Sequence, residues 1–279
     1  MPFDIQWPKS AFYWREDDGE YSFCSIPFTW ELPKVRKFIK KRGGLWRVGG
    51  PACDLMPDYF KDMSNVRSGG GRDGVLQMIA PYATRTTVGC PRSCQFCGIG
   101  RKLIEPIFTE LPDWPDKPVL CDNNLLAASE GHLGRVFDRL RWWGWADFNQ
   151  GLDCRKITRQ IAAQINSIGK PLVRVSLDGW SVKEAWDRAI HYLIEAGVAK
   201  SRIRSYVMIG YGDSPDRDVE RIQYAKNILN PASVGAMWFH ELDAMNANKA
   251  TMRQLAMGWT DRLRVDVMRW SYGKCKKYA

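Results

Sequence analysis

The hydrophobic and polar positions between residues 86 and 242 follow two alternating periods. Short apolar, β-branched runs predict strands, and they lie at residues 86–89, 118–121, 146–151, 172–177, 204–210 and 234–239. The segments between them place apolar residues at helical spacing, most clearly at Val182, Ala185, Trp186, Ala189, Ile190 and Leu193. Because strands and helices alternate, we expect a parallel α/β sheet that binds ligands beyond the carboxyl ends of its strands.

The regions on either side of this core predict two smaller parts. A glycine-rich stretch at residues 67–74 follows a region in which residues 33–41 favour a helix and residues 45–48 a strand. We therefore expect a small N-terminal α/β extension at 1–75 and an α/β core at 76–245. A helical, basic C-terminal tail should follow at 246–279.

Composition narrows the class of protein. The chain has 279 residues, of which 45% are hydrophobic, so it can bury one large core with a small appendage. No apolar stretch is long enough to span a bilayer, and we expect a cytoplasmic protein without a membrane partner. The net charge of +10 favours an anionic partner, and nucleic acid is one candidate.

Three of the eight cysteines are clustered as CxxxCxxC: Cys90, Cys94 and Cys97. A structural zinc site uses four closed ligands, and the chain has three histidines in all, so zinc is the weaker interpretation. Three thiolates can instead hold a cubane iron–sulfur cluster whose fourth iron stays open to a ligand. The alternative left open is a zinc-containing nucleic-acid-binding module without catalysis.

This cysteine loop, placed after the first strand of a six-strand α/β array, resembles the radical S-adenosylmethionine (SAM) superfamily. The resemblance implies a partial (β/α)6 barrel and a 4Fe-4S cluster on Cys90, Cys94 and Cys97. It further implies reductive cleavage of SAM to a 5′-deoxyadenosyl radical, which abstracts hydrogen from a substrate, with flavodoxin or ferredoxin as electron donor. The substrate expected from the charge is a nucleotide or nucleic acid. The core is similar to the cobalamin-associated branch, but the N-terminal region is too short for a complete cobalamin-binding domain.

The same resemblance implies which residues contact SAM. Phe96 would lie near the adenine, Asp122 would receive the amino group, and Ser176 would contact the ribose. The full set of expected cofactor contacts is Phe96, Asp122, Asn123, Asn124, Gln150, Asp153, Arg155, Ser176, Asp178 and Gly210. Two alternatives remain open, because residues 122–124 also suit a turn or helix cap and Asp153 can pair with Arg155.

Two further residues are candidates for catalysis. Cys154, like Cys121, lies at the end of a predicted strand and could donate a hydrogen atom to a substrate radical, although a small buried hydrophobic role is the alternative. His240 follows the sixth predicted strand, where a structural histidine is the alternative. Basic residues cluster at 34–42 and 262–277, either as a phosphate-binding surface or as solvated faces.

Overall fold

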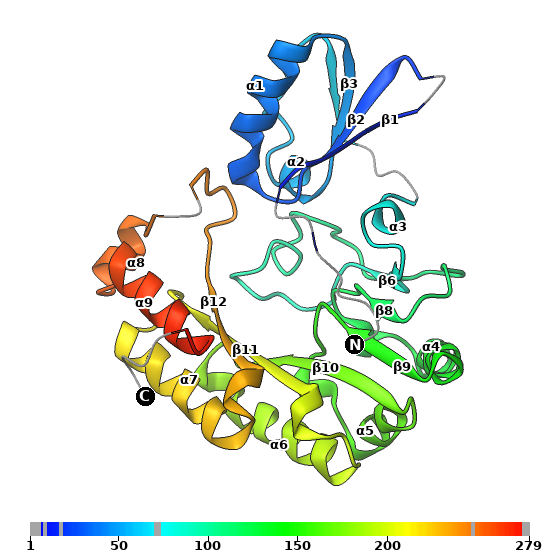
Figure 1. Ribbon diagram of the computed structural model, residues 1–279, viewed down its shortest axis with the longest axis vertical. Coiled ribbons are helices and arrows are strands. Elements are labelled where there is room, and N and C mark those ends of the chain that lie inside the picture. The colour runs from blue at the N-terminus through cyan, green and yellow to red at the C-terminus, as the bar shows by residue number, and fades with distance from the viewer. Residues whose placement is uncertain (1–6, 8–9, 17–18, 70–73, 247–248, 275–279) are drawn as a thin grey trace. The chain divides into compact units, whose positions relative to one another are not determined.

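The computed structural model describes residue 7 and residues 10–16, 19–69, 74–246 and 249–274 (Figure 1). The chain divides into two compact units. Unit 1 comprises Met1–Ala83, Arg92–Pro106 and His240–Ala247, and unit 2 comprises Thr84–Pro91, Ile107–Phe239 and Asn248–Ala279. The division into residues 1–75, 76–245 and 246–279 stays a prediction.

Unit 2 is built on the predicted parallel sheet. Within the described residues the sheet has six strands in the order β12-β11-β10-β9-β8-β5, and the neighbouring strands from β8 to β12 pair in parallel. The strands are β5 Ala83–Thr84, β8 Val119–Leu120, β9 Trp145–Phe148, β10 Lys170–Ser176, β11 Ile203–Ile209 and β12 Val234–Trp238. Spatial order follows chain order, as in a barrel, but β5 and β12 form two separate edges. The α/β class is confirmed, and the open sheet is compatible with a partial barrel.

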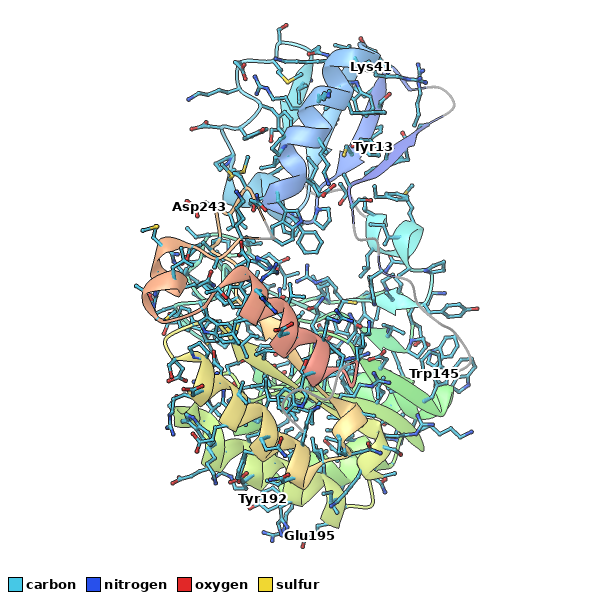
Figure 2. The ribbon with its side chains drawn as sticks, turned by 60° about the vertical axis from the view of Figure 1, so that its left-hand side comes forward. Tyr13, Lys41, Trp145, Tyr192, Glu195 and Asp243 are labelled. Carbon is cyan, nitrogen blue, oxygen red and sulfur yellow. The ribbon has the colours of Figure 1, made fainter. Side chains whose placement is uncertain are left out.

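Four helices connect consecutive strands of this sheet. They are α4 Glu130–Trp143, α5 Arg159–Asn166, α6 Lys183–Glu195 and α7 Pro215–Ile228. Ser129 and Thr158 cap α4 and α5 by accepting backbone N–H groups. Figure 1 shows α5, α6 and α7 on the same side of the sheet, as right-handed crossovers require. Arg159 of α5 joins α6 by an ion pair with Glu195 and by lying over the Tyr192 ring, both labelled in Figure 2.

The first predicted strand, at residues 86–89, is wrong in its placement. The sheet strand is β5, whereas β6 Thr87–Val88 pairs antiparallel with β7 Thr109–Glu110 in a separate two-stranded sheet. The reason is long-range, because Asp122 takes the backbone N–H groups of Thr86 and Thr87 as hydrogen-bond donors. Those groups are therefore unavailable to the parallel sheet.

The C-terminal helices α8 Met252–Ala256 and α9 Asp261–Ser271 belong to unit 2. Ala236 of β12 donates its N–H to Ser271 Oγ and accepts the Tyr272 hydroxyl, each at 2.9 Å. Trp259, Val267 and Trp270 are buried in the main core. The helices expected here are present, and their apolar face completes the core. The basic residues Lys276 and Lys277 lie outside the described residues.

Unit 1 is a smaller α/β structure. Its described sheet has the order β1-β2-β3-β4, with β1 antiparallel to β2 and the other pairs parallel. The strands are β1 Phe12–Arg15, β2 Tyr21–Ser25, β3 Leu45–Gly49 and β4 Val66–Ser68, and the helices are α1 Leu32–Arg42, α2 Pro51–Leu55 and α3 Val75–Ile79. The predicted helix at 33–41 and strand at 45–48 are confirmed.

Among the described residues, no helix combines the length and the apolar character required to cross a membrane.

Candidate functional site

The expected cofactor residues of unit 2 gather at one edge of its sheet. Parallel strands place their carboxyl ends on the same edge. Residues 121–124 follow β8, residues 149–155 follow β9, residues 177–178 follow β10 and residues 210–213 follow β11. The topology therefore brings Asp122, Gln150, Asp153, Asp178 and Gly210 to a common edge, as the sequence pattern predicts.

Asp122 organises the segment that leads into the cysteine loop. Its Oδ1 atom accepts hydrogen bonds from the backbone N–H groups of Thr86 and Thr87 at 2.8 and 2.5 Å, and from their hydroxyls at 3.0 and 2.8 Å. The residue is 2% exposed, and burial raises the pKa of its carboxyl group. Its second oxygen, Oδ2, is buried without a hydrogen bond among the described residues. One oxygen thus holds the loop, while the other remains an unused acceptor.

Asn124 connects the same strand end to the first cysteine. Its Nδ2 atom donates to the sulfur of Cys90 at 3.3 Å. The side chain is buried, and within the described part of the chain its Oδ1 atom has no hydrogen bond. Asn123, between them, is half-buried. Residues 122 and 124 together offer two buried acceptor oxygens, and unsatisfied buried acceptors favour a ligand that donates hydrogen bonds.

The three clustered cysteines are thiols and are each half-buried. Cys90 belongs to unit 2, while Cys94 and Cys97 belong to unit 1, where the Cys97 N–H donates to the Cys94 carbonyl at 3.2 Å. Gly100 is required beside them, because a Cβ atom there would lie 2.6 Å from the Cys94 carbonyl oxygen.

Thiols are the donors that an iron–sulfur cluster uses. Nevertheless, no group of three or more His, Cys, Asp or Glu side chains in the described ranges is arranged to hold a metal ion. The support for a cluster therefore comes from the donor type, from the spacing and from the contact of Cys90 with Asn124.

Asp153 and Arg155 form the salt bridge that the sequence left as an alternative. Arg155 Nη1 donates to Asp153 Oδ1 at 2.7 Å. The same carboxylate accepts the Arg155 backbone N–H and caps the short 3-10 helix Cys154–Lys156. Gln150 is exposed. Cys154 belongs to the main core, and burial raises the pKa of its thiol to about 11, so this residue stays protonated at neutral pH.

Asp178 and the neighbouring arginines are charged groups near the ends of β10 and β11. Burial raises the pKa of Asp178 to about 6, although Arg155 and Arg221 act in the opposite direction. Arg221 of α7 is fully buried and donates to Asp213 Oδ2 at 2.5 Å and to the Met208 carbonyl at 2.6 Å.

Sequence reasoning missed Arg221. The available signal was an Asp at 218 and an Arg at 221 on a helix that follows directly after a Gly-Tyr-Gly-Asp turn. The two side chains form a buried ion pair at 2.5 Å, and burial raises the pKa of Asp218 to about 7.

Gly210 has a structural reason to be glycine. Its φ angle is +78°, and a Cβ atom would lie 2.6 Å from the Trp238 ring. Its N–H donates to Asp218 Oδ2 at 2.8 Å, and its carbonyl accepts from Gln254 Nε2 at 3.1 Å. Gln254, which sequence reasoning also missed, bonds the Phe239 carbonyl as well and so ties α8 to two strand ends.

The positive charge of Arg174 on β10 is balanced by a carboxylate of the neighbouring strand. Arg174 pairs with the buried carboxylate of Asp147 on β9. Ser176, the last residue of β10, is half-buried and lies in register with Tyr206.

A buried chain of hydrogen bonds links α4 to Asp122. Arg135 donates to His132 Nδ1 at 3.2 Å, so the imidazole proton is on Nε2, which lies 3.1 Å from Thr86 Oγ1. The Thr86 hydroxyl in turn donates to Asp122 Oδ1. Burial lowers the pKa of His132, although Glu110 acts in the opposite direction. This chain was not foreseen from the sequence, where His132 had no assigned role.

Phe96 and His240 belong to unit 1. Phe96 is half-buried. The His240 ring lies 4.7 Å from that of Trp30, which is stacked on Phe28. His240 thus takes part in an aromatic group, and its catalytic role stays a prediction.

Comparison with known proteins finds similarity to solved structures only. No family model matches the chain, and no curated protein matches it. Among solved structures, the chain is similar to the radical S-adenosylmethionine methyltransferase TsrM from Kitasatospora setae, solved with tryptophan substrate and the SAM analogue aza-SAM bound. The TM-score is 0.56 at 10% identity, over 78% of this chain and 62% of that one. The chain therefore spans less than two thirds of that protein's length, and the likeness is one of fold.

Proposed function

We propose that the chain is a radical SAM enzyme that binds a 4Fe-4S cluster through Cys90, Cys94 and Cys97. The observation that carries the proposal is the hydrogen bond from Asn124 to Cys90 Sγ at the end of β8. It links the CxxxCxxC loop to a parallel sheet whose strands follow one another in chain order. The similarity of fold to a radical SAM methyltransferase supports the same assignment.

The residues at the strand ends suit SAM in chemical type. The buried acceptors Asp122 Oδ2 and Asn124 Oδ1 would take hydrogen bonds from the SAM amino group. Ser176, at the end of β10, and Asp178, just after it, would contact the ribose hydroxyls. When bound, the cluster would supply the electron that cleaves SAM, and the chain's own residues would orient the cofactor and exclude water.

The remaining contacts have roles in this proposal that follow from their hydrogen bonds. The Asn124 amide would stabilise the Cys90 thiolate by donating to its sulfur. Asp122 Oδ1 would fix the segment preceding Cys90. Arg155 is already paired with Asp153, so contact with the SAM carboxylate would share its guanidinium between two anions.

The test is the metal content and spectrum of protein purified and reconstituted without oxygen. We expect iron and sulfide, a paramagnetic signal after dithionite reduction, and a change in that signal when SAM is added. Stoichiometric zinc without sulfide would contradict the proposal and favour the zinc-containing module. If the paramagnetic signal of the reduced cluster does not change when SAM is added, the proposed SAM site is contradicted but the cluster is not.

A further inference from the structure

The sheet of unit 1 has one face covered by α1 and an opposite face whose described side chains are half-buried or exposed. Cys24, Trp46 and Val48 point to the covered face, where they share a buried cluster with Val35 and Ile39 of α1. Side chains alternate along a strand, so their neighbours lie on the opposite face. That face, here called the aromatic face, carries Phe12, Trp14, Tyr21, Phe23, Arg47 and Arg67, all half-buried or exposed.

Two aromatic and two basic residues form one row across this face. The strand registers pair Trp14 with Phe23, Phe23 with Arg47, and Arg47 with Arg67. The Trp14 and Phe23 rings are stacked, with centroids 5.3 Å apart and planes at 11°. The guanidinium groups of Arg47 and Arg67 lie 4.8 and 5.3 Å from the Tyr21 ring centroid. The row thus offers flat apolar rings next to fixed positive charge.

A cavity of about 580 Å³ opens on the same row, lined by Trp14, Phe23, Arg47 and the glycines at 49 and 50. Its volume lies in the range of small-ligand pockets. The indole N–H of Trp14 is buried without a hydrogen bond among the described residues. A ligand with a hydrogen-bond acceptor would satisfy it. Glu16 also lines the cavity and can accept a hydrogen bond from an amino group.

We propose that the aromatic face binds single-stranded nucleic acid, with one base stacked against the group in which Trp14 already stacks on both Phe12 and Phe23, and with the phosphates at Arg47 and Arg67. Aromatic rings on an open sheet stack any unpaired base, and arginine matches phosphate geometry. The net charge of +10 favours the same partner. The face lies within unit 1 and includes none of Cys90, Cys94 and Cys97, so its test is independent of iron and SAM.

The experiment is fluorescence anisotropy of a labelled oligothymidylate about 12 nucleotides long with the full chain, between about 50 and 200 mM salt. Trp14→Ala should weaken binding about tenfold, and Trp14→Phe should restore most of it. Arg47→Ala should weaken binding and reduce the slope of log affinity against log salt by about 0.7. The matched control is Lys41→Ala on α1, an exposed basic residue that Figure 2 labels, which should leave binding unchanged.

Competitors separate this proposal from other anionic ligands. Thymidine monophosphate, duplex DNA and polyglutamate should each displace the oligonucleotide poorly. Equal displacement by any of them would overturn it, since none presents unpaired bases along a phosphate chain. Equal loss in Arg47→Ala and Lys41→Ala would also overturn it. Because Arg47 is exposed, Arg47→Ala should unfold at the same temperature as the wild type. If Trp14→Ala fails to fold, Arg47→Ala therefore still tests the proposal.

Discussion

The side-chain amide of Asn124 donates a hydrogen bond to the sulfur of Cys90, across 3.3 Å. These residues lie 34 positions apart and come from two strand ends of unit 2. In the proposed enzyme the contact gives Cys90 a fixed donor and a defined place beside β8.

Asn124→Ala removes the donor to Cys90. Loss of a group that supports a metal ligand typically costs about 10- to 100-fold in metal affinity or activity. We expect SAM cleavage to fall by about that factor at equal iron content, measured as 5′-deoxyadenosine formed per cluster. Cleavage at the wild-type rate would mean that the hydrogen bond has no chemical role.

Asp122 should respond differently to two substitutions. Asp122→Ala leaves four buried donors of Thr86 and Thr87 without their acceptor, so the free energy of unfolding should fall by about 3 kcal/mol or more. Asp122→Asn keeps one carbonyl oxygen, and it should fold but bind SAM more weakly. Urea unfolding and equilibrium dialysis measure the two effects. If Asp122→Asn binds SAM as tightly as the wild type, the carboxylate of Asp122 stabilises the fold and does not bind SAM.

Gly210→Ala and Gly212→Ala form a matched pair. Both positions have a positive φ, +78° and +80°, which costs an alanine about 1 kcal/mol or slightly more. Only Gly210 faces an obstacle, the Trp238 ring, while nothing lies within 4 Å of a Cβ at Gly212. We expect Gly210→Ala to lose about 1–3 kcal/mol more than its partner in denaturant unfolding. Equal losses would show that Trp238 moves aside freely.

Asp178 gives stability a defined pH dependence. Its pKa is raised to about 6 in the folded chain, so the folded state binds the proton more tightly than the unfolded state. Its contribution to stability therefore decreases as pH rises from about 4 through about 6. Asp178→Asn removes this penalty, and its stability relative to wild type should increase between those pH values. A difference that is constant with pH in parallel urea titrations would contradict the shifted pKa.

Much of the fold could be predicted because its signals are local. The strands predicted at 172–177, 204–210 and 234–239 match β10, β11 and β12 within two residues at each end, and the helical spacing from Val182 to Leu193 coincides with α6. The segment of β6 was assigned to the wrong sheet, because Thr87 is held by a hydrogen bond to Asp122, which lies 35 residues away. No local pattern reports such a contact.

The site was predictable in position and less so in the roles of its residues. Parallel topology brought the strand-end residues to one edge, which the alternation of elements implies. The burial of Arg221 and Gln254, by contrast, depends on packing against strands far away in sequence. Polar residues on helices are ordinarily expected to face solvent, so neither was selected.

The most direct test of the central claim is the formation of 5′-deoxyadenosine from SAM under anaerobic, reducing conditions, with Cys94→Ala measured in parallel. The proposed function predicts product from the reconstituted wild-type chain and none from Cys94→Ala, whose fold should be retained. Absence of product from wild-type protein that holds its full complement of iron and sulfide would contradict the assignment, as would equal product from both proteins.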